Sequence, residues 1–385
     1  MSAPVVAVVG GGQLARMMQE PANALGIHLR ALVEATDGSS AQVIPDHRAG
    51  SPKSDVDMDW VVQGADVLTF EHEHIPQDQL SRLAGQVAIE PAGEALLYAQ
   101  DKIAMRQRLT EAGIPCPKWF TFSTVEELAE RGDALGFPLI VKWAKGGYDG
   151  HGVALVEKPS DVAEWIDDLA AGEELLAEEA VPFTREVAAL QARSRSGEIA
   201  QWPLTETIQQ DGICKICLAP APDLDPELAR QAQRIGVEIA NALDVTGVLA
   251  VEMFVVEGAH PQVLVNELAM RPHNSGHWTI DGAVTSQFEN HLRAVLDLPL
   301  GSTRPTAPAT CMVNVLGSTL AEPRDAYRRV MAEHPEAKIH YYGKGVRPGR
   351  KLGHVSVTGD DMARARQAAE AVAAALEGAQ APDDK

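Results

Sequence analysis

Two acidic side chains each interrupt an apolar, strand-like run in the second half of the chain. Residues 248–256 have the sequence V-L-A-V-E-M-F-V-V, and residues 263–270 have the sequence V-L-V-N-E-L-A-M. The segment between them is consistent with a hairpin-like return. An ionised carboxylate in such a strand is costly unless it is paired or holds a metal ion. We therefore expect Glu252 and Glu267 to bind Mg²⁺ beside phosphate oxygens, with Asn266 as a neutral helper. Ion pairs with Arg or Lys are the alternative.

A lysine precedes a glycine-rich segment in residues 139–152, which have the sequence L-I-V-K-W-A-K-G-G-Y-D-G-H-G. Alternation along a strand places Lys142 on the face opposite Leu139 and Val141, so its ammonium group projects from a mostly apolar strand and needs an anion. The spacing differs from G-x-x-x-x-G-K-[ST], which excludes a Walker loop. A plain hairpin turn is the alternative to a phosphate loop. The glycines that would permit close backbone approach to a polyphosphate are Gly146, Gly147, Gly150 and Gly152.

A polar loop, R-P-H-N-S-G-H-W, occupies residues 271–278 directly after the second acidic strand. Ligands of α/β sites usually lie at such strand ends. Arg271 supplies a fixed cation, and His273, Asn274 and Ser275 supply small polar groups. This set suits a small anion, or a transition state that gains negative charge.

A basic segment, G-K-G-V-R-P-G-R-K-L-G-H, occupies residues 343–354 of a strongly acidic chain. Its cations are Lys344, Arg347, Arg350 and Lys351, and it contains no acid. Guanidinium groups bind phosphate oxygens through paired hydrogen bonds, so we expect a phosphomonoester site here. A solvated basic turn is the alternative. With the glycine segment, this predicts two phosphate sites, one for a nucleotide and one for a second phosphorylated substrate.

The elements at the N-terminus form a βαβ unit, with a strand at residues 5–9, a helix at 13–25 and a strand at 29–33. Gly10, Gly12 and Ala15 satisfy G-x-G-x-x-A, and Glu34 follows the second strand, where a ribose-binding acid is expected. A nicotinamide dehydrogenase is therefore a rival hypothesis, although it leaves the Lys142 segment unexplained.

The sequence E-H-E-H follows the next strand, which we expect at residues 67–70. Alternation would separate the two acids from the two histidines, so we expect no four-ligand metal cage. Glu71 is a candidate substrate contact, and a solvated strand end is the alternative.

Three units follow from the pattern of elements, residues 1–100, 101–185 and 186–385. The first is of the α/β class and the others are α+β. The middle unit ends with L-L-A-E-E-A-V-P-F at residues 175–183, an extended segment that can present its backbone to an adenine edge, with Glu186 beyond it for ribose hydroxyls. An acidic linker is the alternative.

Composition limits the functional class. The chain has 385 residues, 45% apolar and 23% charged, which is typical of a soluble globular protein of two or three domains. The net charge of −21 argues against a nucleic-acid or anionic-membrane partner. The N-terminal segment lacks a basic region and a long apolar run, so we expect a cytoplasmic protein.

Four cysteines are too few for a disulfide framework in a chain of this length. Cys214 and Cys217 form C-K-I-C in a strand-like run. Residues three apart on a regular strand point to opposite faces, so we expect neither a metal site nor a redox pair.

Taken together, these motifs resemble the ATP-grasp superfamily and, within it, the 5-(carboxyamino)imidazole ribonucleotide synthase family. The opening G-G-G-Q-L-A-R-M, the Q-D-G at residues 210–212 and the R-P-G-R-K-L-G-H near the end are also similar to that family, so the resemblance covers nearly the whole chain. It implies an ATP-grasp fold with an N-terminal doubly wound, Rossmann-like domain, and ATP held between the middle and C-terminal units.

The resemblance also implies roles for individual residues. Magnesium would be bound by Glu252 and Glu267. The residues nearest the reacting groups would be Lys142, Arg271, His273 and Asn274. ATP would contact Lys102, Lys142, Gly146, Gly147, Tyr148, Asp149, Gly150, His151, Gly152, Glu178, Glu179, Ala180, Val181, Glu186, Asn266 and Glu267. The second substrate, aminoimidazole ribonucleotide, would contact Gln13, Leu14, Glu71, Tyr148, Asp149, His273, Asn274, Ser275, Lys344, Arg347, Arg350 and Lys351.

Three positions depart from the family pattern. Lys102 stands where an Arg is usual, which keeps the charge but loses the paired hydrogen bonds. Gln209 replaces a His of some members, and His151 replaces a frequent Arg or Lys.

The implied reaction is an ATP-dependent ligation in purine biosynthesis. Bicarbonate would attack the γ-phosphoryl group of ATP to give carboxyphosphate, and the aminoimidazole amine would capture the activated carbon. The family also implies a homodimer. The alternatives are a related enzyme acting on glycinamide ribonucleotide, the dehydrogenase, and a nucleotide-binding module without activity.

Overall fold

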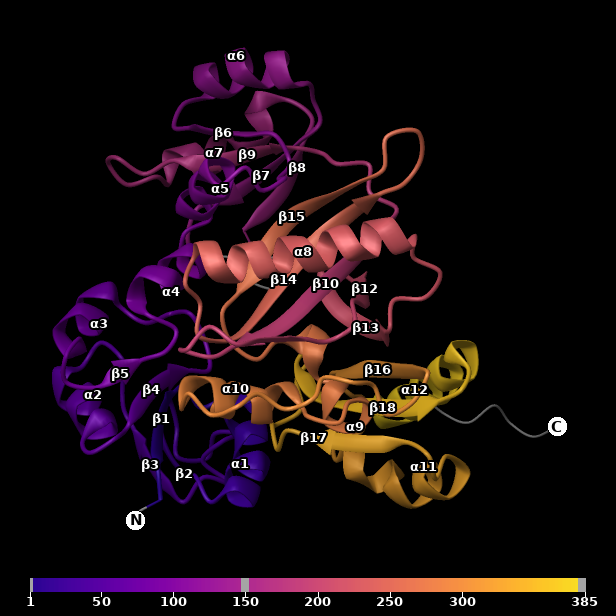
Figure 1. Cartoon of the computed structure of the whole chain (residues 1–385). Helices are drawn as coiled ribbons and strands as arrows, with labels where there is room; N and C mark the ends of the chain where they lie inside the picture. The colour runs from indigo at the N-terminus through magenta and orange to yellow at the C-terminus, as the bar shows by residue number, and fades with distance from the viewer. Residues whose placement is uncertain (1–2, 147–151, 380–385) are drawn as a thin grey trace.

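The computed structural model describes residues 3–146 and 152–379, whose strands form three sheets. Figure 1 shows the N-terminal sheet at the lower left, the small middle sheet at the top and the large C-terminal sheet between and to the right. Among the described residues, no helix is long and apolar enough to cross a lipid bilayer.

The N-terminal sheet is parallel, with strand order β3-β2-β1-β4-β5. Its central strands are apolar and buried because helices cover the sheet, as expected for a βαβ architecture. This confirms the opening βαβ unit and the strand before E-H-E-H. The elements are β1 (Val5–Val9), α1 (Gln13–Leu25), β2 (His28–Val33), β3 (Asp46–Ala49), α2 (Asp55–Val62), β4 (Val67–Phe70), α3 (Gln77–Leu83), β5 (Ala88–Ile89) and α4 (Gly93–Gln100).

The middle sheet is antiparallel, with strand order β6-β9-β7-β8. Leu139 and Val141 of β7 are fully buried in its core, as the alternation predicted. The helical segment after β8 is short: it begins as a 3-10 turn, ends at Asp167, and is followed by a turn at Gly172, whose φ is 86°. The elements are α5 (Lys102–Glu111), β6 (Trp119–Phe122), α6 (Val125–Leu135), β7 (Leu139–Trp143), β8 (Val153–Val156), η1 (Pro159–Val162), α7 (Ala163–Asp167) and β9 (Leu175–Glu179).

The large sheet is antiparallel and has strand order β15-β14-β10-β12-β13-β16-β18-β17, with β11 beside β10. The short strand beside β10 ends at Gln201, shortly before Pro203, which has no backbone N–H to donate. The strands are β10 (Arg185–Arg193), β11 (Ile199–Gln201), β12 (Thr205–Gln210), β13 (Ile213–Ala219), β14 (Gly247–Val256), β15 (Gln262–Ala269), β16 (Ala309–Leu316), β17 (Lys338–Tyr341) and β18 (Lys351–Gly359). The helices are α8 (Pro226–Ala242), η2 (Asn274–Gly276), α9 (Thr279–Gly282), α10 (Gln287–Val295), η3 (Pro323–Ala326), α11 (Tyr327–Glu333) and α12 (Met362–Leu376).

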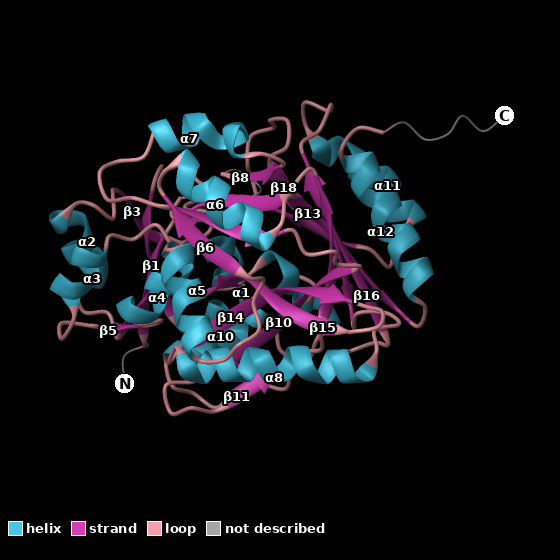
Figure 2. Ribbon diagram, turned by 90° about the horizontal axis from the view of Figure 1, so that it is seen from above, coloured by secondary structure: helices cyan, strands magenta, loops and turns pink. Residues whose placement is uncertain are grey.

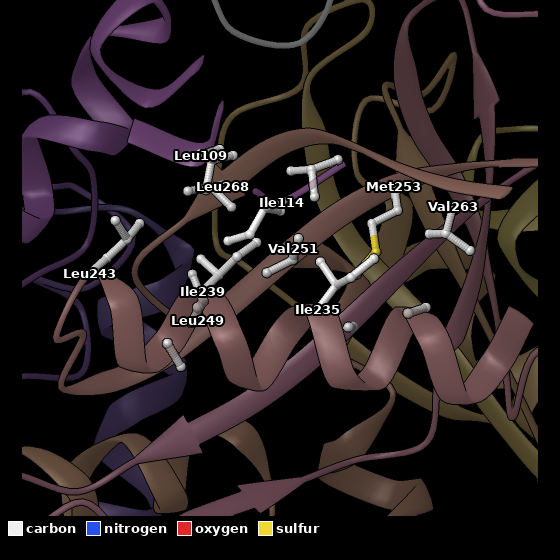
Figure 3. Close-up of a cluster of buried hydrophobic side chains, with 14 of the residues drawn as sticks. Leu109, Ile114, Ile235, Ile239, Leu243, Leu249, Val251, Met253, Val263 and Leu268 are labelled. Carbon is white, nitrogen blue, oxygen red and sulfur yellow. The ribbon is translucent and has the colours of Figure 1, made fainter. Parts of the chain in front are cut away.

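Helix α8 covers the strands that carry the two acids. Asp225 caps it by accepting from the backbone N–H groups of Glu227 and Leu228. Its apolar stripe packs on β14 and β15, together with Leu109 of α5 and Ile114, as Figure 3 shows. The view in Figure 2 shows α8 running along one side of the large sheet and α12 along another. This helix therefore holds β14 and β15 in place behind the acids.

The prediction that Cys214 and Cys217 point to opposite faces is wrong. The pairing register between β12 and β13 shifts from Ile208 with Ile216 to Gln209 with Cys214, so Lys215 is an extra residue in a β-bulge. The bulge reverses the alternation, and the two Sγ atoms lie 3.6 Å apart.

Candidate nucleotide-binding cleft

A cleft of about 1200 Å³, called the main cleft below, is lined by residues from all three units of the chain. It brings together most of the side chains that the sequence singled out, although they are distant along the chain. The predicted residues that line it are Gln13, Leu14, Glu71, Lys102, Lys142, Gly146, Glu178, Glu179, Ala180, Val181, Glu186, Glu252, Asn266, Glu267, Arg271, His273, Asn274 and Lys351.

Lys142 lies in the cleft with its ammonium group held by two oxygens. Its Nζ atom is 2.7 Å from Glu178 Oε2 and donates to Asn266 Oδ1 at 3.0 Å. Glu178 comes from β9, which pairs with β7, and Asn266 comes from β15 of the large sheet. The lysine therefore joins the middle and C-terminal units at the cleft.

Arg106 of α5 completes this cluster, and sequence reasoning missed it. Its Nε atom donates to Glu178 Oε1, and its Nη2 atom donates to the backbone oxygen of Asn266 at 2.7 Å. Arg106 and Glu178 are almost fully buried. Burial alone would raise the pKa of Glu178, but the charges of Arg106 and Lys142 outweigh it and lower the pKa to about 2. The available signal was the position of Arg106 four residues after Lys102 on the same helix, since residues at that spacing share one helix face.

The two acids predicted to bind metal face each other. Glu252 and Glu267 are cross-strand neighbours in the β14–β15 ladder, next to a bulge. Burial, and then the negative charges of Glu267 and Glu186, raise the pKa of Glu252 to about 8. Lys102 Nζ lies 3.9 Å from Glu267 Oε1. Such crowded carboxylates suit a divalent cation, which favours the ionised form. Because residues 3–146 and 152–379 contain no group of three or more His, Cys, Asp or Glu ligands, the cation would need other oxygens as well.

The loop after β15 is rigidly held. Arg271 Nε lies 2.7 Å from Glu73 Oε1, which ties the loop to the N-terminal unit. Gln287 accepts from the backbone N–H of His273 and donates to its carbonyl, both at 2.8 Å. Burial, and then the charges of Arg271 and Lys351, lower the pKa of His273 to about 3, so its imidazole is neutral.

Asn274 offers a donor from the same loop. Its Oδ1 atom accepts from Asn314 Nδ2 at 3.0 Å, while its buried Nδ2 atom has no hydrogen-bond partner among the described residues. Ser275 is fully buried behind the loop, where its Oγ atom lies 2.9 Å from His273 Nδ1, and it does not line the main cleft.

The N-terminal unit contributes Glu71, whose Oε1 atom accepts from the backbone N–H of Leu14 at 3.2 Å. A Cβ atom on Gly12 would lie only 2.1 Å from this oxygen, so glycine permits the close approach. Glu34 accepts from the backbone N–H of Gly11 at 2.9 Å and lies 3.3 Å from His72 Nε2. The acid assigned to ribose binding in the dehydrogenase hypothesis is thus engaged by residues of two neighbouring loops.

An apolar wall lines one part of the main cleft, and sequence reasoning assigned it no role. Val153 and Leu155 of β8 are 41% and 59% exposed, although both are apolar. Phe183 stacks on Phe254 with ring centroids 4.6 Å apart. Ile140 and Leu268 also line the cleft. The signal was present, since β8 is apolar on both faces and only one face can pack on the middle sheet's core.

The basic segment is divided between two places. Lys351 lines the main cleft, and Lys344 donates to Gln13 Oε1. Lys344 also lines a smaller hollow of about 410 Å³ with Arg16 and Arg324. Arg350 donates to the backbone oxygen of Gly345 at 3.0 Å, and neither it nor Arg347 lines the main cleft.

The glycine segment is only partly described. Gly146 lines the main cleft, and the carbonyl of Gly152 accepts from Trp143 N at 3.0 Å. The predicted contacts through Gly147, Tyr148, Asp149, Gly150 and His151 lie outside the described residues. Gln209, another of the three departures from the family pattern, donates to Glu186 Oε2 at 3.5 Å.

Three family models match consecutive parts of the chain. They are described as the ribonucleotide synthetase preATP-grasp domain over residues 4–100, the ATP-grasp domain over 107–288, and the phosphoribosylaminoimidazole carboxylase C-terminal domain over 310–368.

Whole-chain comparisons agree with these models. The N5-carboxyaminoimidazole ribonucleotide synthase of Mycobacterium tuberculosis is 48% identical over 376 residues, covering 96% of this chain and 87% of that protein. The crystal structure of the Thermus thermophilus synthetase has a TM-score of 0.87 at 36% identity, and covers 98% of this chain and 100% of that one. The Aspergillus clavatus synthase, solved with ADP and 5-aminoimidazole ribonucleotide, has a TM-score of 0.87 at 33% identity, with 97% of this chain and 99% of that one covered.

Proposed function

The chain belongs to the N5-carboxyaminoimidazole ribonucleotide synthase family of ATP-grasp ligases, and we propose that the main cleft is where it binds ATP, Mg²⁺, bicarbonate and the ribonucleotide. The family resemblance found in the motifs and the ATP-grasp fold class are confirmed. The protein is an ATP-dependent ligase of purine biosynthesis that carboxylates 5-aminoimidazole ribonucleotide with bicarbonate and yields ADP and phosphate.

The observation that carries the proposed arrangement is that Lys142, an apolar wall and a pair of acids line one cleft. The wall formed by Ile140, Val153, Leu155, Phe183, Phe254 and Leu268 accommodates the adenine ring, since an apolar surface stabilises a planar base. The segment from the end of β9 to Val181 lines the cleft and presents backbone groups to the adenine edge. The phosphates then extend toward Lys142, whose ammonium group binds their oxygens.

Glu252, Glu267 and the side chain of Asn266 would hold Mg²⁺, with phosphate oxygens as its remaining ligands. When bound, the ion neutralises charge on the transferring phosphoryl group. Lys102 binds phosphate from the side of Glu267 as a point charge, since it lacks the fork of an arginine.

Bicarbonate binds at the loop after β15. The guanidinium group of Arg271 and the unpartnered amide donor of Asn274 stabilise the negative charge of bicarbonate and of the carboxyphosphate made from it. The neutral ring of His273 adds no charge and can accept a hydrogen bond.

The ribonucleotide binds beside the N-terminal unit, against Gln13, Leu14 and Glu71. Its phosphate is bound by Lys351 and Lys344, which approach this region from the C-terminal unit. The aminoimidazole amine then lies next to the bicarbonate loop, where it captures the activated carbon.

The test is phosphate release from MgATP with 5-aminoimidazole ribonucleotide and bicarbonate, with each component omitted in turn, and a direct measurement of the carbamate. Release that requires the ribonucleotide and forms the carbamate supports the proposal. Release only with glycinamide ribonucleotide and formate would keep the fold and replace the second substrate. ATP binding without any amine-dependent release would leave a binding module.

We also propose, from the family resemblance, a homodimer that works in the cytoplasm. Sedimentation equilibrium of the purified protein tests the dimer, since a monomer of 41.2 kDa is readily distinguished from twice that mass.

A further inference from the structure

The two cysteines of C-K-I-C form a close pair that the ligase reaction does not use. The β-bulge at Lys215 places Cys214 Sγ and Cys217 Sγ 3.6 Å apart on the same side of β13. Lys215 itself donates to the backbone oxygen of Asn314 at 2.8 Å and pairs with Glu377. The bulge is therefore held in place by contacts of the residue between the cysteines.

The two cysteines differ in their access to the main cleft. Cys214 lines the cleft and is 8% exposed, whereas Cys217 is fully buried. A small oxidant that enters the cleft can therefore reach Cys214 first, with Cys217 directly behind it.

Both cysteines are connected to the loop that we assign to bicarbonate. Asn314 Nδ2 donates to the backbone oxygen of Cys214 at 2.9 Å and to Asn274 Oδ1 at 3.0 Å. Cys217 Sγ lies 4.0 Å from the backbone oxygen of Asn274. A movement of either cysteine therefore displaces a contact of Asn274.

We propose that Cys214 and Cys217 are an oxidation site, in which a peroxide converts the two thiols into an intrachain disulfide and lowers the ligase activity. The Cys214 thiol reduces the peroxide to water or an alcohol and becomes a sulfenic acid. The Cys217 sulfur then attacks the Cys214 sulfur, the S–S bond forms, and the hydroxyl leaves as water after taking the Cys217 proton. A thiol reductant reverses the change.

The geometry supports both parts of the proposal. An S–S bond is about 2.0 Å long, so the two sulfurs must approach each other by roughly 1.5 Å from their resting distance. A shift of that size within a bulge is local, and Asn314 and the Asn274 backbone transmit it to the loop. The effect on activity rests on the proposed function, whereas formation of the disulfide does not.

A metal site is a weaker interpretation of the same pair. Within residues 3–146 and 152–379, no third His, Cys, Asp or Glu joins the two thiols as a possible ligand. The two remaining cysteines are separate, Cys116 beside Arg106 and Cys311 in the core under α12.

The first test is peptide mapping of the full-length protein after treatment with hydrogen peroxide, under non-reducing conditions and with free thiols alkylated. We expect the peptide that contains residues 214–217 to lose two hydrogen atoms and to resist alkylation. Cys217→Ser should abolish this product, and Cys311→Ala should retain it. The same treatment of the urea-unfolded chain serves as the positive control, because it tests whether the conditions can oxidise the two thiols. Free thiols at both positions in the folded protein, or a disulfide to a different cysteine, would overturn the proposal.

The second test is phosphate release by the oxidised protein. We expect a decrease of roughly tenfold or more, as for an ångström-scale misplacement near the reacting groups, with recovery after reduction. Cys217→Ser cannot form the disulfide, so the same peroxide treatment should not lower its activity by this route. Complete disulfide formation with unchanged turnover would refute the link to the loop. If the proposed function itself fails, no turnover is seen before oxidation, and the mapping still decides whether the disulfide forms.

Discussion

Replacing Arg106 with Met tests the cluster that positions Lys142. Arg106 donates to Glu178 and to the Asn266 backbone, and both ion-pair partners are almost fully buried. Removing one partner of a buried ion pair costs roughly 3–5 kcal/mol, because the other charge stays buried without compensation. Glu178 keeps Lys142 as a partner at 2.7 Å, so we expect the lower end of this range, about 3 kcal/mol in the free energy of unfolding.

The matched control is Arg108→Met on the same helix. Arg108 is only half-buried and donates one hydrogen bond, to the Ala242 backbone at 3.0 Å. Its loss should cost about 1 kcal/mol. The double variant R106M/E178Q should recover part of the loss, because replacing both charges avoids the uncompensated carboxylate.

Urea unfolding at several pH values provides the measurement. The folded pKa of Glu178 lies at about 2, below its usual 4.5, so the carboxylate stabilises the protein above pH 4.5 and this contribution is lost as the pH falls toward 2. Without Arg106 the folded pKa of Glu178 rises. The difference in the free energy of unfolding between the wild type and Arg106→Met should therefore narrow below pH 4.5. A gap under about 1 kcal/mol at neutral pH, or one that does not change with pH, would refute the reasoning.

Three further predictions concern the cleft. Lys142→Met should lower phosphate release by roughly 100-fold, with the circular dichroism spectrum unchanged, because a cation at the phosphates is lost. Glu252 has a folded pKa of about 8, above its usual 4.5, so its contribution to stability is lost as the pH rises through this window. In the presence of a chelator, the melting temperature of Glu252→Gln relative to the wild type should therefore increase from pH 5 to pH 8, and added Mg²⁺ should reduce this increase. Plots of melting temperature against pH that stay parallel for the two proteins would contradict this account. Phe183→Ala should raise the KM for ATP by roughly three- to tenfold in steady-state kinetics with little change in kcat, since it removes a stacked ring from the apolar wall.

The elements that carry the site could be predicted from local pattern. The two apolar runs predicted the β14–β15 hairpin, and alternation along β7 placed Lys142 opposite Leu139 and Val141, which are buried in the core as predicted. The acids could be singled out because an ionisable group in an apolar strand is rare enough to require an explanation.

The cysteine pair could not be predicted in the same way. The bulge at Lys215 depends on that residue's contacts with Asn314 and Glu377, which are about 100 and 160 residues away. Alternation is a property of a regular strand, and a single extra residue reverses it. The neighbours that impose the bulge become visible only in the folded chain.

The same limit applies to Lys142, for which the sequence predicts the need for an anion but not which anion. In the folded chain that anion is Glu178, and its presence raises the question of how the lysine can still attract phosphate. Arg106 answers it, because two cations and one carboxylate leave a net positive charge beside the cleft. Glu178 thus holds the ammonium group in position without neutralising the site. Because these charges come from α5, β7 and β9, their balance is a property of the tertiary structure, and no single segment contains it.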